Sequence, residues 1–259
     1  MQRATRVPIS GVHSPVYHVN DTSSTLDLAA ALLADTTTAT PHLTTIIADH
    51  QSAGRGRLGR TWTTPDGQAL LASTIVSLPT SFPTEMLGWL VHACALSVRD
   101  ALSPRLSPLG HTVSLKWPND VLLDGRKICG ILCERVDGLA VLGWGVNISM
   151  DETELPVPGA GSLLLAGLPH GKDELTAAIL TSLQRWFEQW QTTGQVREGF
   201  MAACDTIGRS VLIHEDVDSA DSAVVAGTAV GVDDTGALVV EDADGHRRVH
   251  SAGDVIHLR

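Results

Sequence analysis

A glycine-rich segment of this chain holds three arginines within six positions. The segment covers residues 51–62 and reads QSAGRGRLGRTW, with Arg55, Arg57 and Arg60 as its charged members. Glycine lets a backbone approach a ligand closely, and several guanidinium groups can converge on one anionic group such as a phosphate. The pattern therefore predicts a phosphate-binding loop, whose arginines would repel one another when no anion is bound.

Two other interpretations of this segment must be weighed. It matches the GxGxxG pattern of dinucleotide-binding folds, but that pattern needs a helix directly after it and an acidic residue about 20 positions further on. Here the next residues, TTPDG, cannot form a helix, and the region around residue 79 has no acid. We reject that match. A solvated surface loop whose arginines contact nothing remains the plain alternative unless a second motif supports the first reading.

The motif KWPND at residues 116–120 is that second observation, because it places a lysine at the end of an apolar strand. An ammonium group that faces the interior loses hydration unless an anion balances its charge. Lys116 is therefore suited to bring a carboxylate and a phosphate together, unless its alkyl chain carries the charge to solvent. Taken alone, Asn119 and Asp120 are more simply read as turn-forming residues.

The composition of the 259-residue chain limits the classes of function. Acidic residues outnumber basic ones by 29 to 18, and the formal net charge of −11 disfavours broad contact with nucleic acid or an anionic membrane. No run approaches the roughly 20 apolar residues of a membrane span, and no secretory signal is recognised. The four cysteines form no CxxC pair, so neither a disulfide scaffold nor a zinc site is indicated. We expect a soluble cytoplasmic protein.

The elements that must position these motifs follow from hydrophobic periodicity and turn signals. Helices are predicted over residues 24–34, 86–102, 173–191 and 195–204. Strands are predicted over 42–48, 69–78 and, around an Asp-Gly turn at 124–125, through 114–149. After residue 205, short β segments separated by Asp/Gly turns predict a small barrel. We divide the chain into a tail (1–20), a large domain (21–205) and a small β domain (206–259).

Four separated motifs make this sequence resemble the biotin protein ligases, the biotin–[acetyl-CoA-carboxylase] ligases. They are a Ser-Thr pair at residues 24–25, the loop at 51–62, KWPNDVLLDGRKICGILCE at 116–134 and GWGVNIS at 143–149. The resemblance implies an α+β fold: a mixed, mainly antiparallel sheet with flanking helices, as in class II synthetases, plus a C-terminal SH3-like β barrel. Only about 20 residues precede the Ser-Thr pair, which favours the ligase-only type without an N-terminal DNA-binding domain.

The activity implied by this resemblance is the ATP-dependent, AMP-forming attachment of biotin to a protein. The family makes biotinyl-5′-AMP from biotin and ATP, with Mg²⁺ held mainly by the phosphates, and transfers biotin to a lysine of a carboxylase's biotin carboxyl carrier domain. Lys116 and Arg57 are the implied catalytic residues. The implied biotin-binding residues are Ser24, Thr25, Gln51, Gly54, Arg55, Gly56, Arg57, Lys116 and Gly130. The implied ATP- or adenylate-binding residues are Arg55, Arg57, Arg60, Trp62, Lys116, Asn119 and Asn147.

Two alternative functions stay open at this point. A lipoate–protein ligase or octanoyltransferase of the same superfamily shares the fold and a lysine, although the GRGRxGR loop is typical of the biotin branch. A non-catalytic nucleic-acid-binding module would use the arginine loop and the barrel, although one basic loop in so acidic a chain is a small electrostatic footprint. We expect no DNA or membrane partner. Leu26 stands where family members commonly carry Asn, so a contact of the ring pocket or a bond at the helix start should differ.

Overall fold

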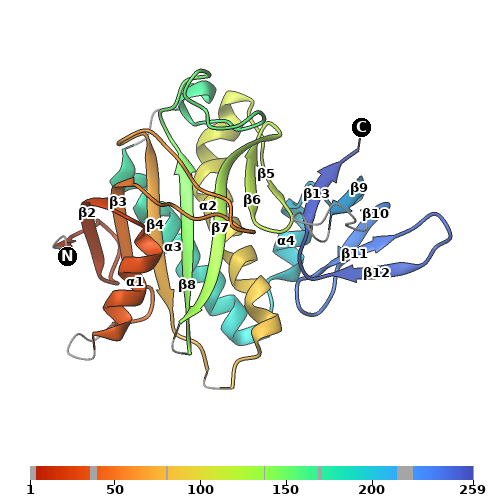
Figure 1. The fold of residues 1–259 in the computed structure, drawn as a ribbon, viewed down its shortest axis with the longest axis horizontal. Coiled ribbons are helices and arrows are strands. Elements are labelled where there is room, and N and C mark those ends of the chain that lie inside the picture. The colour runs from red at the N-terminus through yellow and green to blue at the C-terminus, as the bar shows by residue number, and fades with distance from the viewer. Residues whose placement is uncertain are drawn as a thin grey trace.

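The fold is built on one large sheet that carries helices on both faces (Figure 1). The computed structural model describes residues 4–35, 40–79, 81–136, 138–168, 171–214 and 224–258. The sheet has eight strands in the order β1-β2-β3-β4-β8-β7-β6-β5, and only the β2–β3 pair is parallel. These strands are β1 (Thr5–Val7), β2 (Val16–Thr22), β3 (Thr45–Gln51), β4 (Ala69–Val76), β5 (Val113–Lys116), β6 (Asp120–Leu123), β7 (Arg126–Val136) and β8 (Leu139–Asn147). The predicted mixed, mainly antiparallel sheet is confirmed.

Helices separate the two faces of this sheet. Helix α1 (Thr25–Ala34) packs on β3, β4 and β8, whereas α2 (Leu87–Leu106) packs on β5 to β8 from the other side, with α3 (Lys172–Thr193) against it. The remaining helices are α4 (Arg197–Ala203) and the short 3₁₀ turns η1 (Thr84–Met86), η2 (Ser107–Leu109) and η3 (Leu164–Ala166). Among the described residues, no helix is both long and apolar enough to cross a bilayer.

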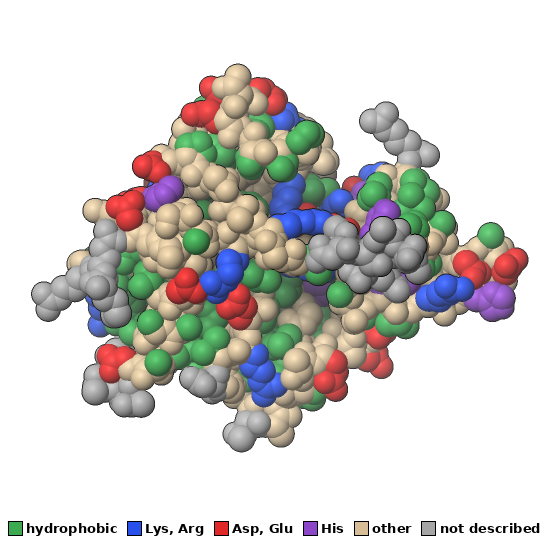
Figure 2. Space-filling view, in the orientation of Figure 1, with side chains coloured by type: hydrophobic (Ala, Val, Ile, Leu, Met, Phe, Trp, Pro, Cys, Tyr) green, Lys and Arg blue, Asp and Glu red, His purple; other side chains and the backbone are tan. Residues whose placement is uncertain are grey.

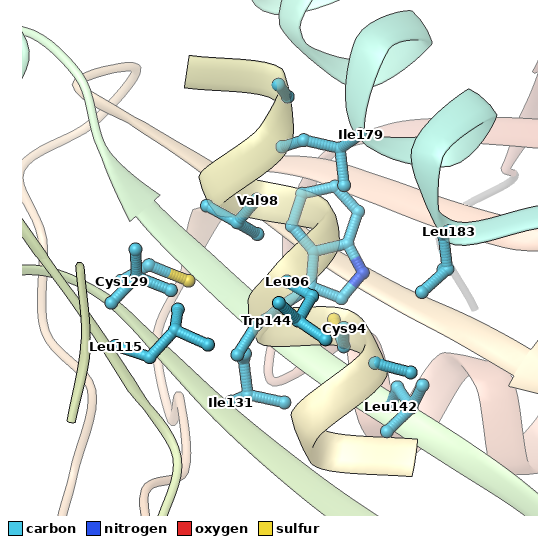
Figure 3. Close-up of a cluster of buried hydrophobic side chains, with 14 of the residues drawn as sticks. Cys94, Leu96, Val98, Leu115, Cys129, Ile131, Leu142, Trp144, Ile179 and Leu183 are labelled. Atoms are coloured by element: carbon cyan, nitrogen blue, oxygen red, sulfur yellow. The ribbon is translucent and has the colours of Figure 1, made fainter. Parts of the chain in front are cut away.

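The main core lies between the sheet and α2, because this helix is apolar around most of its circumference. Figure 3 shows part of that layer, in which Trp144 of β8 and Ile131 of β7 lie among Cys94 and Leu96 of α2. The α2 side of the sheet therefore carries the larger core, and a smaller cluster on the opposite side packs Ile46, Ile75 and Val141 against α1.

The C-terminal part forms a second, five-stranded antiparallel sheet in the order β12-β11-β10-β9-β13. Its strands are β9 (Ser210–His214), β10 (Val224–Val232), β11 (Leu238–Glu241), β12 (Arg247–His250) and β13 (Asp254–His257). All of its pairings are antiparallel, as the expected SH3-like barrel requires. Two buried indoles join this sheet to the rest: Trp89 Nε1 donates to the Asp234 carbonyl at 2.8 Å, and Trp117 Nε1 donates to the Gly236 carbonyl at 3.1 Å.

The N-terminal residues differ from the expected tail over residues 1–20. Within the described part of that stretch, residues 5–7 already form β1, and β2 begins at residue 16 and pairs in parallel with β3. Only Val16 and Val19 of β2 are fully buried, and His18 and Asn20 face outward or to the rim. A strand buried at so few positions lacks the alternation that predicts strands from sequence, which explains the difference.

Candidate functional site

A cavity of about 990 Å³ opens where the loop at residues 51–62 crosses the α1 face of the large sheet. Its floor includes Gly130 of β7, Gly143 and Gly145 of β8, and Gly130 pairs with Gly145. Glycines on one face of two neighbouring strands leave the sheet surface bare, so a planar group can lie directly on the backbone. All of the predicted site residues line this cavity except Gly54.

One end of the cavity, beside α1, is lined by buried neutral polar groups. Ser24 caps α1 and its Oγ accepts from the Leu26 amide at 3.2 Å. The Oε1 atom of Gln51 accepts from the Thr25 amide at 2.7 Å and from its hydroxyl at 3.0 Å, and Ser73 Oγ donates to Thr25 Oγ1 at 2.8 Å. These bonds fix the hydroxyl and amide groups in advance, which suits a neutral ring with several hydrogen-bonding atoms.

Leu26 forms an apolar part of the same wall. Its amide keeps the bond to Ser24, so the helix start lost nothing at this position. Its side chain lies against Gly143, where an added Cβ would come within 3.0 Å of Leu26 Cγ. The departure from the family pattern therefore replaces a polar side chain of the wall with a methyl-rich surface seated on a glycine.

The loop itself is a short hairpin. Trp62 N donates to the Gly54 carbonyl at 2.9 Å and Gly56 N to the Arg60 carbonyl at 2.7 Å. Its tip turns through Leu58, at a φ of 54°, and Gly59. A Cβ at Gly54 would stand 2.4 Å from the Trp62 carbonyl oxygen, so this glycine permits a close approach of two backbones rather than lining the cavity.

Arg57 and Arg60 are held by the C-terminal sheet. The Arg57 guanidinium donates to the Asn119 side-chain oxygen at 3.3 Å and to the Gly253 carbonyl at 3.4 Å, and Arg60 forms an ion pair with Asp254. Burial lowers the pKa of Arg57. Lysine and arginine side chains gather in the hollow where this sheet meets the larger body (Figure 2). Strand β13 thus supplies one wall of the cationic end of the cavity.

Arg55 has different partners, on the opposite side of the loop. Its guanidinium donates to Asp27 at 2.5 Å and to both carboxylate oxygens of Glu134, at 3.2 and 3.1 Å. The hydrogen bond to Asp27, with that to Glu134, raises the pKa of Arg55 against a smaller opposing effect of burial. Acids from other elements pair with Arg55 and Arg60 and offset part of the mutual repulsion expected for the loop, whereas Arg60 adds to burial in lowering the pKa of Arg57.

Lys116 is the last residue of β5 and is half buried. Among the described residues, no carboxylate oxygen lies within 4.0 Å of it, although Asp120 is its partner in the β5–β6 register. Asp120 instead forms an ion pair with Lys127, in which Lys127 Nζ lies 2.6 Å from Asp120 Oδ1. Lys127 therefore neutralises the neighbouring acid, and the charge of Lys116 stays available for an anion in the cavity.

Lys127 lines the cavity but was not predicted as a site residue. A β-bulge explains why, since Val121 pairs with Cys129 whereas the next residue, Leu122, pairs with Lys127. Skipping one residue of β7 turns Lys127 to the same face as Gly130, and a Cβ at Gly130 would lie 3.2 Å from Lys127 Cε. Strict alternation would place these two residues on opposite faces.

Trp62 lies flat on the glycine floor. A Cβ at Gly145 would meet its Cε2 at 2.7 Å, and one at Gly130 would meet its Cζ3 at 2.9 Å. Within the described chain, the buried Trp62 Nε1 and Asn147 Oδ1 have no hydrogen-bond partner. A buried polar atom without a partner costs about 1–3 kcal/mol, so one donor and one acceptor of this cavity are left for a ligand to satisfy.

Comparison with known proteins now identifies the family. Residues 20–151 match the sequence model of the biotin/lipoate A/B protein ligase family, and residues 217–258 match the biotin protein ligase C terminal domain. The chain belongs to the biotin/lipoate A/B protein ligase family. Within this ligase family, the first match contains the loop, Lys116 and Asn147, and the second contains the Gly253–Asp254 wall.

Individual relatives place the chain on the biotin side of this ligase family. It is similar to the biotin–[acetyl-CoA-carboxylase] ligase of Mycobacterium tuberculosis, at 36% identity over 83% of this chain and 79% of the relative. The enzyme of the same name from Paracoccus denitrificans is 31% identical over 80% of this chain and 88% of the relative. In fold, the chain is similar to the biotin protein ligase of Aquifex aeolicus in complex with biotin and ATP, with a TM-score of 0.75 at 22% identity over 96% of this chain and 100% of that one.

Proposed function

We propose that this chain is an ATP-dependent, AMP-forming biotin–protein ligase that biotinylates the carrier domain of a biotin-dependent carboxylase. The names of the relatives favour biotin over lipoate or octanoate, and their length of match favours an enzyme over a nucleic-acid-binding module. One observation carries the proposal: a single cavity has a neutral hydrogen-bonding end beside α1 and a cationic end beside β13. Biotin has a neutral ureido ring and an anionic tail, and a cytoplasmic location would supply ATP and carboxylase.

In the first step, a carboxylate oxygen of biotin attacks the α-phosphorus of ATP, and pyrophosphate leaves. Two anions must meet, so neutralisation and alignment dominate the barrier. We assign the ring to Ser24, Thr25 and Gln51, and the carboxylate and α-phosphate to Lys116. Arg57, which has no carboxylate partner in the described chain, can exchange its three long hydrogen bonds to the Asn119 and Gly253 oxygens for bonds to phosphate oxygens.

We assign the nucleotide to the region around the remaining predicted residues. Trp62 offers a ring face beside the glycine floor, and Asn147 offers an unpaired side-chain oxygen. Arg60 and Asn119 stand beside Arg57 at the cationic end, and the backbones of Arg55 and Gly56 would close over the biotin tail, while Gly54 holds the base of the loop against Trp62. Gly130 belongs to the floor of the cavity, where Trp62 and Lys127 lie over its backbone.

In the second step, the amine of the carrier lysine attacks the carbonyl carbon of biotinyl-5′-AMP, and AMP leaves. The new amide bond requires the amine to lose a proton. Asp120 already accepts Lys127 at 2.6 Å, which favours a phosphate oxygen of the departing AMP as the proton acceptor. The protein therefore contributes position and charge rather than a nucleophile of its own.

Mg²⁺ belongs to this proposal as a companion of ATP. The two carboxylates that line the cavity, Asp120 and Asp254, are each paired with a cation. In the described chain, the group of acids and histidines close enough to share a metal is Asp242, Asp244 and His246, in the β11–β12 hairpin. Because both cavity carboxylates are already paired, the site fits a Mg²⁺ ion that is held by the phosphates of ATP. The ion would offset the charge of those phosphates. Chelation with EDTA should abolish pyrophosphate release, and excess Mg²⁺ should restore it.

The proposal is tested by incubating the chain with biotin, ATP, Mg²⁺ and a biotin carboxyl carrier domain, and then weighing the carrier by mass spectrometry. We expect the mass of one biotinyl group on the parent carrier and none on a carrier whose acceptor lysine is replaced by arginine. Pyrophosphate release driven by lipoate or octanoate but not by biotin would place the chain on the other branch of the family.

A further inference from the structure

We propose that Arg55 is a positioning residue whose guanidinium fastens the loop at residues 51–62 to α1 and β7, and so keeps the adenylate enclosed without binding a phosphate itself. This inference rests on the proposed function. We call Asp27, Arg55 and Glu134 the loop clamp. Asp27 lies in the first turn of α1 and Glu134 on β7, so the clamp joins three segments that are far apart in sequence.

The geometry of the loop clamp is that of a strong, directional contact. Arg55 uses Nη1 on Asp27 and both Nε and Nη2 on Glu134, the second being a bidentate pairing. A planar fork matched to a carboxylate fixes orientation as well as distance. Arg55 lines the cavity, but all three of its guanidinium nitrogens already donate to carboxylates of the protein.

The charge of the loop clamp also argues against a phosphate ligand. Two carboxylates share one guanidinium, so the cluster carries a formal charge of −1 and would repel a phosphate. Arg57 is the contrast, because its partners are a side-chain amide oxygen and a backbone carbonyl, both uncharged. The alternating arginines of the loop therefore divide into one that faces a ligand and one that anchors.

The loop clamp reaches the substrate-facing wall through short connections. Ser23 Oγ donates to Asp27 at 3.0 Å, and the Ala53 amide donates to the Ser23 carbonyl at 2.9 Å. The base of the loop is thereby tied to the residue that precedes Ser24. Loosening the loop clamp would therefore open the cavity beside its neutral end. It would not remove any of the side chains that we assign to the ureido ring of biotin.

The size of the effect follows from exposure. The clamp side chains are between 34% and 48% exposed, so solvent weakens each of the two ion pairs. Breaking both pairs should therefore leave the fold intact and accelerate escape of the adenylate by about tenfold, which corresponds to ~1.4 kcal/mol. Chemistry at phosphorus should be spared.

The test uses Asp27→Asn, Glu134→Gln and the double variant, which keep Arg55 charged but remove its anchors. Adenylate is formed with biotin and ATP, and its rate of release is followed after a chase, alongside pyrophosphate release and the KM for ATP. We expect faster escape with an unchanged KM for ATP. Slower escape with a lower KM would overturn the inference, because it would mean that a freed Arg55 binds phosphate.

Two controls and one independent readout complete the test. Glu152→Gln breaks the exposed pair with Arg126 and should keep the parent's escape rate, whereas Arg55→Lys keeps the charge without the fork and should match the double variant. Trypsin cleavage after the loop arginines of the unliganded chain should be faster in the double variant. Equal cleavage of the double variant and the parent would refute the loop clamp. If the double variant is cleaved faster but the parent forms no adenylate, the loop clamp stands and the proposed function is refuted.

Discussion

Lys116 differs from the other two lysines of the described chain in having no carboxylate oxygen within 4.0 Å of its ammonium. Lys127 lies 2.6 Å from Asp120 and Lys172 lies 2.9 Å from Asp49, so each of those charges is balanced inside the protein. The ammonium of a half-buried lysine without a carboxylate within 4.0 Å is stabilised most by an anion that arrives from outside. The positive charge at Lys116 Nζ is therefore available to bind an anionic ligand.

Replacing Lys116 by Met should slow the first step far more than it weakens ATP binding. Removing one charged contact to the reacting phosphate is expected to cost about 2.7–4 kcal/mol of barrier, a loss of 10²–10³-fold, by analogy with oxyanion donors. Biotin-dependent pyrophosphate release and the Kd for ATP measure the two effects separately. Lys172→Met is the control, and equal release by the Lys116 variant and the parent would disprove the role.

Arg57→Ala should leave the fold unchanged and shorten the lifetime of the adenylate, because the variant lacks the cation that we assign to the phosphates. A quenched-flow assay of adenylate formation and loss gives both rates. Arg247→Ala is the matched control, since Arg247 pairs with Glu241 on an exposed hairpin outside the cavity. An unaltered lifetime in the Arg57 variant would contradict its assignment.

The bare floor of β7 and β8 sets what the cavity can hold. Gly130 and Gly145 face each other across the strand pair, and Trp62 lies on both. A side chain at either position would lift the ring by the thickness of a methyl group. The spacing between floor and loop is therefore fixed by backbone, not by adjustable side chains.

Gly145→Ala should displace Trp62 and raise the KM for ATP, because the new Cβ would stand 2.7 Å from the ring. Overpacking of this kind typically costs about 1–3 kcal/mol of stability. Urea unfolding and ATP kinetics measure the two consequences. Gly171→Ala is the control: it meets nothing within 4 Å and should behave as the parent does. A Gly145 variant with parental KM would show that the ring position does not matter.

Local sequence patterns predicted many of the helices and strands. They missed features that depend on strand register or on contacts between residues far apart in the sequence. The helix at α1, the antiparallel run from β5 to β8 and the cavity positions of Lys116 and Arg57 followed from periodicity and motif. Lys127 was missed because a bulge reverses its face. Asp254 was missed because it meets Arg60 across 194 residues of chain, and no local spacing encodes such a contact.

At the scale of the whole molecule, one turn of the C-terminal sheet and one aromatic cluster form a buried contact between this sheet and the rest of the chain. The turn accepts the indole N–H groups of Trp89 and Trp117, and beneath it His92 stacks on Phe200 with ring centroids 3.8 Å apart. We propose that the boundary between the large domain and the small β domain lies near Asp205. The two parts share a buried, specific joint rather than a loose tether.

Acid should weaken this joint through His92. Burial lowers the pKa of His92 to about 3, whereas an unfolded histidine has a pKa of about 6.5. Between these values the unfolded chain binds a proton that the folded chain excludes, so stability is lost as pH falls from about 6.5 toward 3, by up to ~1.4 kcal/mol per pH unit. Denaturant unfolding at several pH values gives the free energy of unfolding as a function of pH, and this dependence should be weaker for His92→Phe than for the parent. An identical pH dependence would exclude His92 as a cause of the loss of stability in acid.

The tryptophan of the lysine motif bears on any attempt to shorten this chain. Trp117 adjoins Lys116, and its indole nitrogen is buried against the Gly236 carbonyl. A trimmed version that ends near residue 205 would remove that acceptor and expose the indole ring of the residue next to Lys116. A minimal catalyst therefore needs more than deletion: the second residue of KWPND would have to be redesigned together with the cut.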